Sequence, residues 1–195
     1  MELKDNLDDT SEIYINKYDK KIKQCCILKD IKFHAIDKKC LGIILTPYYD
    51  IYQKTADYLT ISPIFSLQDF FDDFLIEKKL TAEQIIGKET LSKTKYGSTY
   101  YEFINKYLKN NNTRMYFLPE NPGKFEDSII DLSIIETILI EDFNNYTKIC
   151  EINSPWNQDI ITSYASFCVR IGTKDYSDEL LEKVMSKISK LKVKD

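Results

Sequence analysis

Two short apolar runs, each followed by a proline, constrain the fold of this chain more than any other feature. Residues 41–46 are almost continuously apolar and precede Pro47, and residues 58–62 precede Pro63. A continuous apolar run of this length is typical of a strand that is buried on both faces, and proline cannot donate a hydrogen bond to a sheet. The pattern therefore predicts strands over residues 41–46 and 58–62 in a small β core.

Helix signals dominate the middle of the chain. Ser66 is an N-cap residue with an acid three positions later, Thr81 precedes Gln84 at the same spacing, and aromatic side chains recur at helical spacing after Gly97 until Asn110. Such caps satisfy the free N–H groups of a first helical turn. We predict a helical insertion over about residues 66–110.

Strand patterns return after this insertion, and helix patterns follow them. Apolar runs at 114–118, 128–132 and 137–140 predict a meander. Ser154-Pro155 is a strong helix start, with proline in the first helical turn, and the apolar stripe of this helix runs on to Gly172. We divide the chain into a flexible lead-in (1–11), an α+β domain (12–173) and a C-terminal helix (174–195).

The predicted fold class is therefore α+β. Its sheet is expected to be small, mostly antiparallel and barrel-like, similar to an SH3 or PemK barrel, interrupted by the helical insertion and covered by the C-terminal helices. At 195 residues the chain is long enough for one ordinary core and short for two.

Composition excludes several functional classes. No apolar run approaches the roughly 18 residues of a membrane helix, and the acidic N-terminal segment has no signal-peptide pattern, which favours a cytoplasmic protein. The net charge of −4 disfavours a broad DNA-binding surface.

Catalytic and metal-binding signatures are missing from the sequence. The five cysteines lack a CxxC spacing, and His34 is the only histidine. No nucleotide-binding or hydrolase motif occurs either. We therefore expect no metal, no cofactor and no complete catalytic set.

The first candidate site is Tyr48-Tyr49-Asp50, a predicted turn after the first strand. A carboxylate beside two phenols can hold a polar ligand or supply an acid. Aspartate is also common in turns because it bonds to nearby backbone groups. Both interpretations remain open.

Arg114 and Arg170 are the second candidates, because every other basic residue of the chain except the histidine is lysine. A guanidinium group suits a phosphate or carboxylate ligand. Internal ion pairs with Asp131 or Asp50 are an equally good interpretation, and Arg170 also lies where a cation stabilises a helix end.

Residues 93–114 interleave lysines with tyrosines, a pattern typical of surfaces on which single-stranded nucleic acid stacks. Ordinary helix amphipathicity explains the same pattern.

Three segments resemble an uncharacterised bacterial family. They are LTPYYDI at 45–51, RMYFLP at 114–119 with 129–132, and NSPW at 153–156 with RIGT at 170–173. The resemblance implies a small cytoplasmic protein encoded beside GHKL-type ATPase or response-regulator genes in stress or defence loci. Where the family has cysteine before the aspartate, this chain has Tyr49. The strand with its Thr-Pro turn also resembles the PemK and MazF toxins, which cleave RNA.

These observations favour a non-enzymatic interaction or regulatory protein with a protein partner. The candidate contact residues are Tyr48, Tyr49, Asp50, Arg114 and Arg170. The alternatives are a PemK-like endoribonuclease, in which Asp50 and an arginine act on RNA, and a single-stranded nucleic-acid binding protein.

Overall fold

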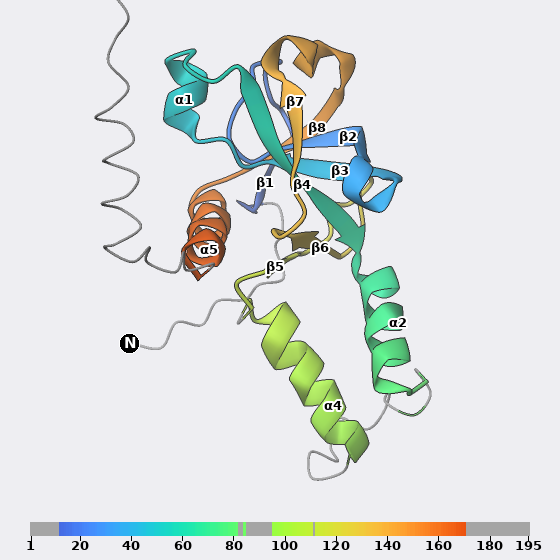
Figure 1. The fold of residues 1–195 in the computed structure, drawn as a ribbon. Helices are drawn as coiled ribbons and strands as arrows, with labels where there is room; N and C mark the ends of the chain where they lie inside the picture. The colour runs from blue at the N-terminus through green and yellow to red at the C-terminus, as the bar shows by residue number, and fades with distance from the viewer. Residues whose placement is uncertain (1–11, 82–83, 85–94, 111, 171–195) are drawn as a thin grey trace, which may run out of the picture.

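One antiparallel sheet of eight strands organises the molecule (Figure 1). The computed structural model describes residues 12–81, 84, 95–110 and 112–170. The strands are β1 (Tyr14–Ile15), β2 (Cys26–Phe33), β3 (Lys38–Ile44), β4 (Tyr58–Ser66), β5 (Met115–Leu118), β6 (Ser128–Asp131), β7 (Glu136–Leu139) and β8 (Thr147–Ile152). Their order is β1-β8-β2-β3-β4-β6-β5, and β7 also pairs with β4. The α+β class with a mostly antiparallel sheet is confirmed.

The sheet is open, so the predicted barrel is wrong. Strands β1 and β5 lie at the two ends of the strand order and do not pair with each other. β1 has only two residues, and both of them pair with β8. The Tyr14 side chain of β1 reaches the segment after β5, where its hydroxyl donates to the carbonyl of Pro119, but no backbone pairing between β1 and β5 closes the described sheet.

Apolar side chains cover both faces of the sheet. Helix α5 (Trp156–Arg170) packs on one face, where Ile160 is buried with Ile27 and Ile43. On the other face, Leu28 and Ile44 are covered by short elements: the 3-10 turn η2 (His34–Ile36), helix α1 (Tyr48–Tyr52) and the 3-10 segment η4 (Ile140–Asn145), which contributes the buried Phe143. The expectation that the first predicted strand is buried on both faces is confirmed.

Helices α2 (Leu67–Lys78) and α4 (Lys95–Phe103), with the π-helical turn η3 (Ile104–Leu108), extend beyond the end of β4 (Figure 1). They pack through Phe74, Phe103 and Tyr107, which contact Ile129 of the sheet. The predicted cap at Ser66 is confirmed, because its hydroxyl accepts hydrogen bonds from the N–H groups of Gln68 and Asp69. The predicted helix after Thr81 lies largely outside the described residues.

Strand β4 runs through Pro63, where the sequence predicted an end. The backbone carbonyl of Asp57 and the backbone N–H of Leu67 form hydrogen bonds toward β7 and β6, respectively. The backbone groups of the odd-numbered residues of β4, Pro63 included, therefore face the edge that β6 and β7 occupy. There the partner strand is interrupted between β6 and β7, and the Ser62 hydroxyl donates to the carbonyls of Asp131 (2.6 Å) and Ile134 (3.1 Å). The missing N–H of Pro63 is therefore tolerated.

The predicted meander is wrong beyond its first hairpin. β5 pairs with β6, but β7 pairs with β4 and continues the same edge as β6. A separate strand, β8, lies between β1 and β2, and no apolar pattern predicted it.

Helix α5 starts after Ser154-Pro155, as predicted, and its expected end at Gly172 lies outside the described residues. Cys168 of this helix is exposed. In the part of the chain that the structure describes, no helix combines the length and apolar character needed to cross a bilayer.

Candidate functional site

Tyr48, Tyr49 and Asp50 lie in the five-residue helix α1, so the predicted turn is wrong. Pro47 precedes the helix with extended geometry, and its carbonyl accepts the N–H of Ile51. Ile51 packs against the sheet and gives the helix an apolar side. The carbonyl of Asp50 accepts the N–H of Thr55 at 3.0 Å. The aspartate thus closes the helix end.

The tyrosines of α1 face solvent. Tyr48 is 56% exposed, Tyr49 67% and Tyr52 68%. The rings of Tyr48 and Tyr52 stack with their centroids 5.8 Å apart and their planes 20° from parallel. Large aromatic side chains that remain this exposed often mark contact sites.

A hollow with a volume of about 790 Å³ lies beside these tyrosines and is called the α1 hollow below. Its walls are the 19–23 segment, α1 with residues 54–57, and η4. Its floor is apolar and consists of Ile22, Ile51, Ile140 and Phe143. Segments far apart in the sequence thus meet at this place, and only α1 was predicted as part of a site.

The rim of the α1 hollow carries more free positive than negative charge. Lys20, Lys21 and Lys54 line it, and no carboxylate among the described residues forms an ion pair with them. Asp19 forms an ion pair with Lys23. Of the two rim carboxylates, Asp57 is the one that forms no ion pair with a described residue. An anionic group is therefore favoured at this rim.

The 19–23 segment is held in place by a buried lysine. The Lys148 ammonium donates to the carbonyls of Asp19 (3.0 Å) and Lys21 (2.8 Å) and to the carboxylate of Glu151. Lys148 is 8% exposed and Glu151 4%. Glu151 also binds Lys23 at 3.1 Å, and this hydrogen bond raises the pKa of Lys23. One wall of the hollow is thus fixed to β8.

Arg114 is engaged in an internal ion pair, one of the two interpretations that the sequence left open. Its Nε and Nη2 atoms donate to the two oxygens of Asp131 at 3.1 and 2.9 Å. These hydrogen bonds raise the pKa of Arg114. Asp131 lies opposite the middle of β4, next to Ser62, whereas Asp50 lies where β4 begins. The structure does not bring Asp50 and Arg114 together.

Arg170 is the last described residue of α5, and its side chain lies outside what the structure describes. α5 packs on the opposite face of the sheet from Ile51 of α1. The five predicted contact residues therefore do not form one site.

Within the lysine and tyrosine pattern of residues 93–114, the described tyrosine is explained by packing. Tyr107 is buried, with its ring 5.0 Å from that of Phe70 and 5.2 Å from that of Phe103. Lys106 lies over the same ring at 5.2 Å. The side chains of Tyr96 and Tyr100, and all of Lys93, lie outside the described part. The ring of Tyr107 is not available for stacking with a base.

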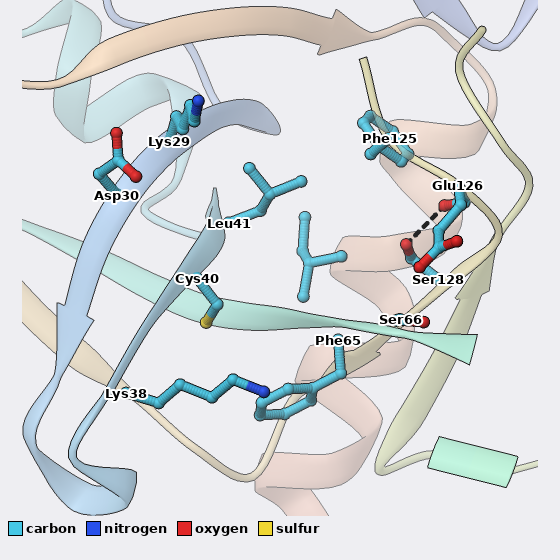
Figure 2. A pocket seen from close by; sticks show the side chains of 11 residues that line it. Lys29, Asp30, Lys38, Cys40, Leu41, Phe65, Ser66, Phe125, Glu126 and Ser128 are labelled. Atoms are coloured by element: carbon cyan, nitrogen blue, oxygen red, sulfur yellow. Dashed lines mark hydrogen bonds between the residues drawn. The ribbon is translucent and has the colours of Figure 1, made fainter. Parts of the chain in front are cut away.

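A second hollow, of about 490 Å³, opens between β3, β4 and the segment before β6 (Figure 2). Lys38, Ser66 and Ser128 of its lining have partners within the protein, whereas Lys29, Asp30 and Glu126 form no ion pair with a described residue. Lys38 lies 3.8 Å from Asp69 and over the ring of Phe65, Ser66 caps α2, and the Ser128 hydroxyl donates to the carbonyl of Glu126 at 2.6 Å. Figure 2 shows Lys29 and Asp30, which carry opposite charges, at one side. This hollow is a weaker candidate for a binding site.

The thiols and the single histidine do not assemble into a reactive centre. Burial raises the pKa of Cys25 to about 12 and that of Cys150 to about 11. His34 lies in the exposed turn η2, and its ring nitrogen contacts Glu136 at 3.0 Å. Among the described residues, no three His, Cys, Asp or Glu side chains are grouped to hold a metal ion.

The α1 hollow is therefore the best candidate site of the described molecule, since it combines exposed tyrosines, unpaired lysines and an apolar floor. Its geometry suits binding. In comparisons with known proteins, no family model, no curated protein and no solved structure matches this chain.

Proposed function

We propose that this chain is a non-enzymatic interaction protein and that the α1 hollow is its contact surface for a protein partner. The observation that carries the proposal is the exposure of Tyr48, Tyr49 and Tyr52 beside an apolar-floored hollow. Tyrosine is enriched in the few residues that supply most of the binding energy of protein interfaces. Three such side chains on one short helix form a compact contact patch.

The chemistry of the hollow supports binding more than catalysis. The described residues that line it include no histidine or cysteine. A general base needs to reach the proton that it removes, and a nucleophile needs an adjacent base. An endoribonuclease would need Asp50 and an arginine around one phosphate, whereas Arg114 is bound to Asp131 and distant from α1. The ribonuclease alternative is less well supported.

The resemblance of three sequence segments to proteins of stress and defence loci supports a role in such a bacterial module. In this proposal the chain regulates or assembles with the product of a neighbouring gene. The residues around Tyr49 and Asp50 would make the contact.

Single-stranded nucleic acid is the second candidate ligand, and one observation favours it. Tyr48 and Tyr52 stack at the edge of a hollow whose Lys20, Lys21 and Lys54 form no ion pair with any described residue, as on surfaces where bases stack. Binding of this kind weakens steeply with salt because phosphate contacts release counterions. The candidate surface for it is α1, not residues 93–114.

Site-specific photocrosslinking in the bacterium that encodes the protein tests the proposal. A photoreactive phenylalanine analogue replaces Tyr49, and a matched control carries it at Ile76 of α2, which is 72% exposed. We expect a discrete protein adduct only from position 49, and its loss when Tyr48→Ser and Tyr52→Ser are added. Equal adducts at both positions contradict the proposal.

Induced expression tests the ribonuclease alternative. Growth and total RNA integrity are followed for the wild type, for Asp50→Ala and for Arg114→Ala with Arg170→Ala. We expect intact RNA in all of them. RNA breakdown that Asp50→Ala abolishes would make the protein an enzyme.

A further inference from the structure

We infer that the partner contributes an acidic segment that inserts a large apolar side chain into the α1 hollow. This inference rests on the proposed function and specifies the chemistry of the partner at the same site. It combines the charge of the rim, the character of the floor and the rigidity of one wall.

The rim selects for negative charge. Lys20 and Lys21 come from one wall and Lys54 from the other, so an extended segment that crosses the hollow passes between ammonium groups that form no ion pair with a described carboxylate. The whole chain has a net charge of −4, so this rim differs in sign from the rest of the molecule. A local cationic site on an acidic protein steers an acidic segment to one place and repels it elsewhere.

The floor selects for an apolar side chain. Ile22, Ile51 and Ile140 are only half-buried, and they surround the more deeply buried Phe143. Covering such surface stabilises a complex by about 25 cal/mol for each Å² removed from water. A hollow of about 790 Å³ is large enough for several side chains. An acidic segment without an apolar side chain would leave the floor of the hollow exposed to water.

The floor also favours a peptide over a nucleic acid. A base gains most by stacking on an aromatic face, but three of the four floor residues are isoleucines. An aliphatic or aromatic peptide side chain fits this floor better than a polar base.

The wall that carries Lys20 and Lys21 is ordered before binding. Lys148 donates to the backbone carbonyls on both sides of Lys20, at Asp19 and Lys21. Binding therefore does not have to order this backbone, which lowers the entropic cost of forming the complex. The position of the cations is a property of the free protein.

Fluorescence anisotropy with synthetic peptides tests the inference. The probe is a fluorescein-labelled peptide of about 12 residues, about 40 Å when extended, in which Asp and Glu flank a central Leu-Phe pair. One control peptide has Asn and Gln in place of the acids, and the other has Ser-Ser in place of Leu-Phe. We expect saturable binding of the probe and at least about tenfold weaker binding of each control, or about 1.4 kcal/mol.

Matched protein variants locate the binding site. Lys20→Gln, Lys21→Gln and Lys54→Gln together are expected to weaken binding of the acidic probe by at least about tenfold. The control variant, Lys29→Gln with Lys39→Gln and Lys109→Gln, removes the same charge from exposed positions outside the hollow and should bind as the wild type does. Circular dichroism confirms that both variants are folded.

The outcomes separate the inference from the proposed function. If the photoreactive residue at position 49 still gives its protein adduct but the acidic probe binds no better than the neutral one, the hollow is a contact site. The inference that the partner segment is acidic is then wrong. If the adduct is also absent, the proposed function fails with it. Tighter binding of a fluorescein-labelled oligouridine than of the peptide would overturn the inference in favour of RNA.

Discussion

The two ends of β4 each carry aromatic side chains beside lysines, but three aromatic rings beyond its end are buried together, whereas those at its start are open to solvent. Beyond the end of β4, Phe74, Phe103 and Tyr107 pack together where α2 meets α4 and η3. At its start, Tyr48 and Tyr52 stand on a five-residue helix that nothing in the described structure covers. The comparison teaches that a pattern of lysine and aromatic residues leaves an exposed aromatic surface only where no second apolar element packs on it.

The largest expected effect is on the free energy of unfolding, and it distinguishes the buried aromatic residues beyond the end of β4 from the exposed ones at its start. Phe103→Ala removes a buried ring from the α2–α4 contact and should lower the free energy of unfolding by about 3–5 kcal/mol. Tyr52→Ala, the matched control at the other end, should change it by less than about 0.5 kcal/mol. Urea denaturation followed by circular dichroism measures both. Equal losses would mean that Tyr52 is part of the core.

A smaller effect is expected from the buried lysine that holds the α1 hollow. Lys148→Met leaves Glu151 with Lys23 as its remaining ion-pair partner and frees the carbonyls of Asp19 and Lys21. We expect a loss of about 2–3 kcal/mol, because a buried carboxylate loses one of its partners. Amide hydrogen exchange should accelerate in the 19–23 segment and stay unchanged in α2.

Adding Glu151→Met to Lys148→Met is the control for this prediction. The double variant also removes the buried carboxylate that has lost a partner, so it should recover part of the lost stability while exchange in the 19–23 segment remains fast. If exchange is unchanged in both variants, Lys148 does not hold this wall.

The smallest effect concerns pH and a residue opposite the middle of β4. Partial burial alone would raise the pKa of Glu136, but hydrogen bonds from the backbone and ring of His34 lower it below its ordinary value of 4.5. A lowered folded-state pKa adds stability above the ordinary value, and this stability is lost as the pH falls through the lowered one.

Glu136→Gln should therefore cost less than about 1 kcal/mol at pH 7, and the difference from the wild type should vanish at the acid end of the curve. Urea midpoints measured between pH 7 and the acid limit of folding test this. A difference that grows as the pH falls would have the wrong sign.

The sequence predicted those elements whose signals are local. The Ser66 cap and the strand containing Ile43 and Ile44 need only their own residues, and both were found. β8 was missed because two of its six residues, Lys148 and Glu151, are charged yet buried. Their burial depends on partners in the 19–23 segment, which no pattern within the strand reveals. Pro63 was misread for the same reason, since the break opposite it lies in another strand.

The candidate site was predicted only in part for a similar reason. Tyr48 and Tyr49 stood out as exposed aromatic residues after a strand, but their neighbours in the hollow come from the 19–23 segment and from η4. Those segments reach α1 through the packing of the whole sheet. Arg114 stood out because arginine is rare in this chain, and its partner Asp131 accounts for it.

The placement of the cysteines gives the protein a built-in labelling position. Cys25, Cys26 and Cys150 are buried, Cys40 is half-buried, and Cys168 is exposed on α5. Burial raises the pKa values of Cys25 and Cys150, so these thiols react slowly with maleimides at neutral pH. A fluorophore attached to Cys168 sits on the helix that covers the sheet face opposite Ile51 and Phe143, and so leaves the α1 hollow unobstructed.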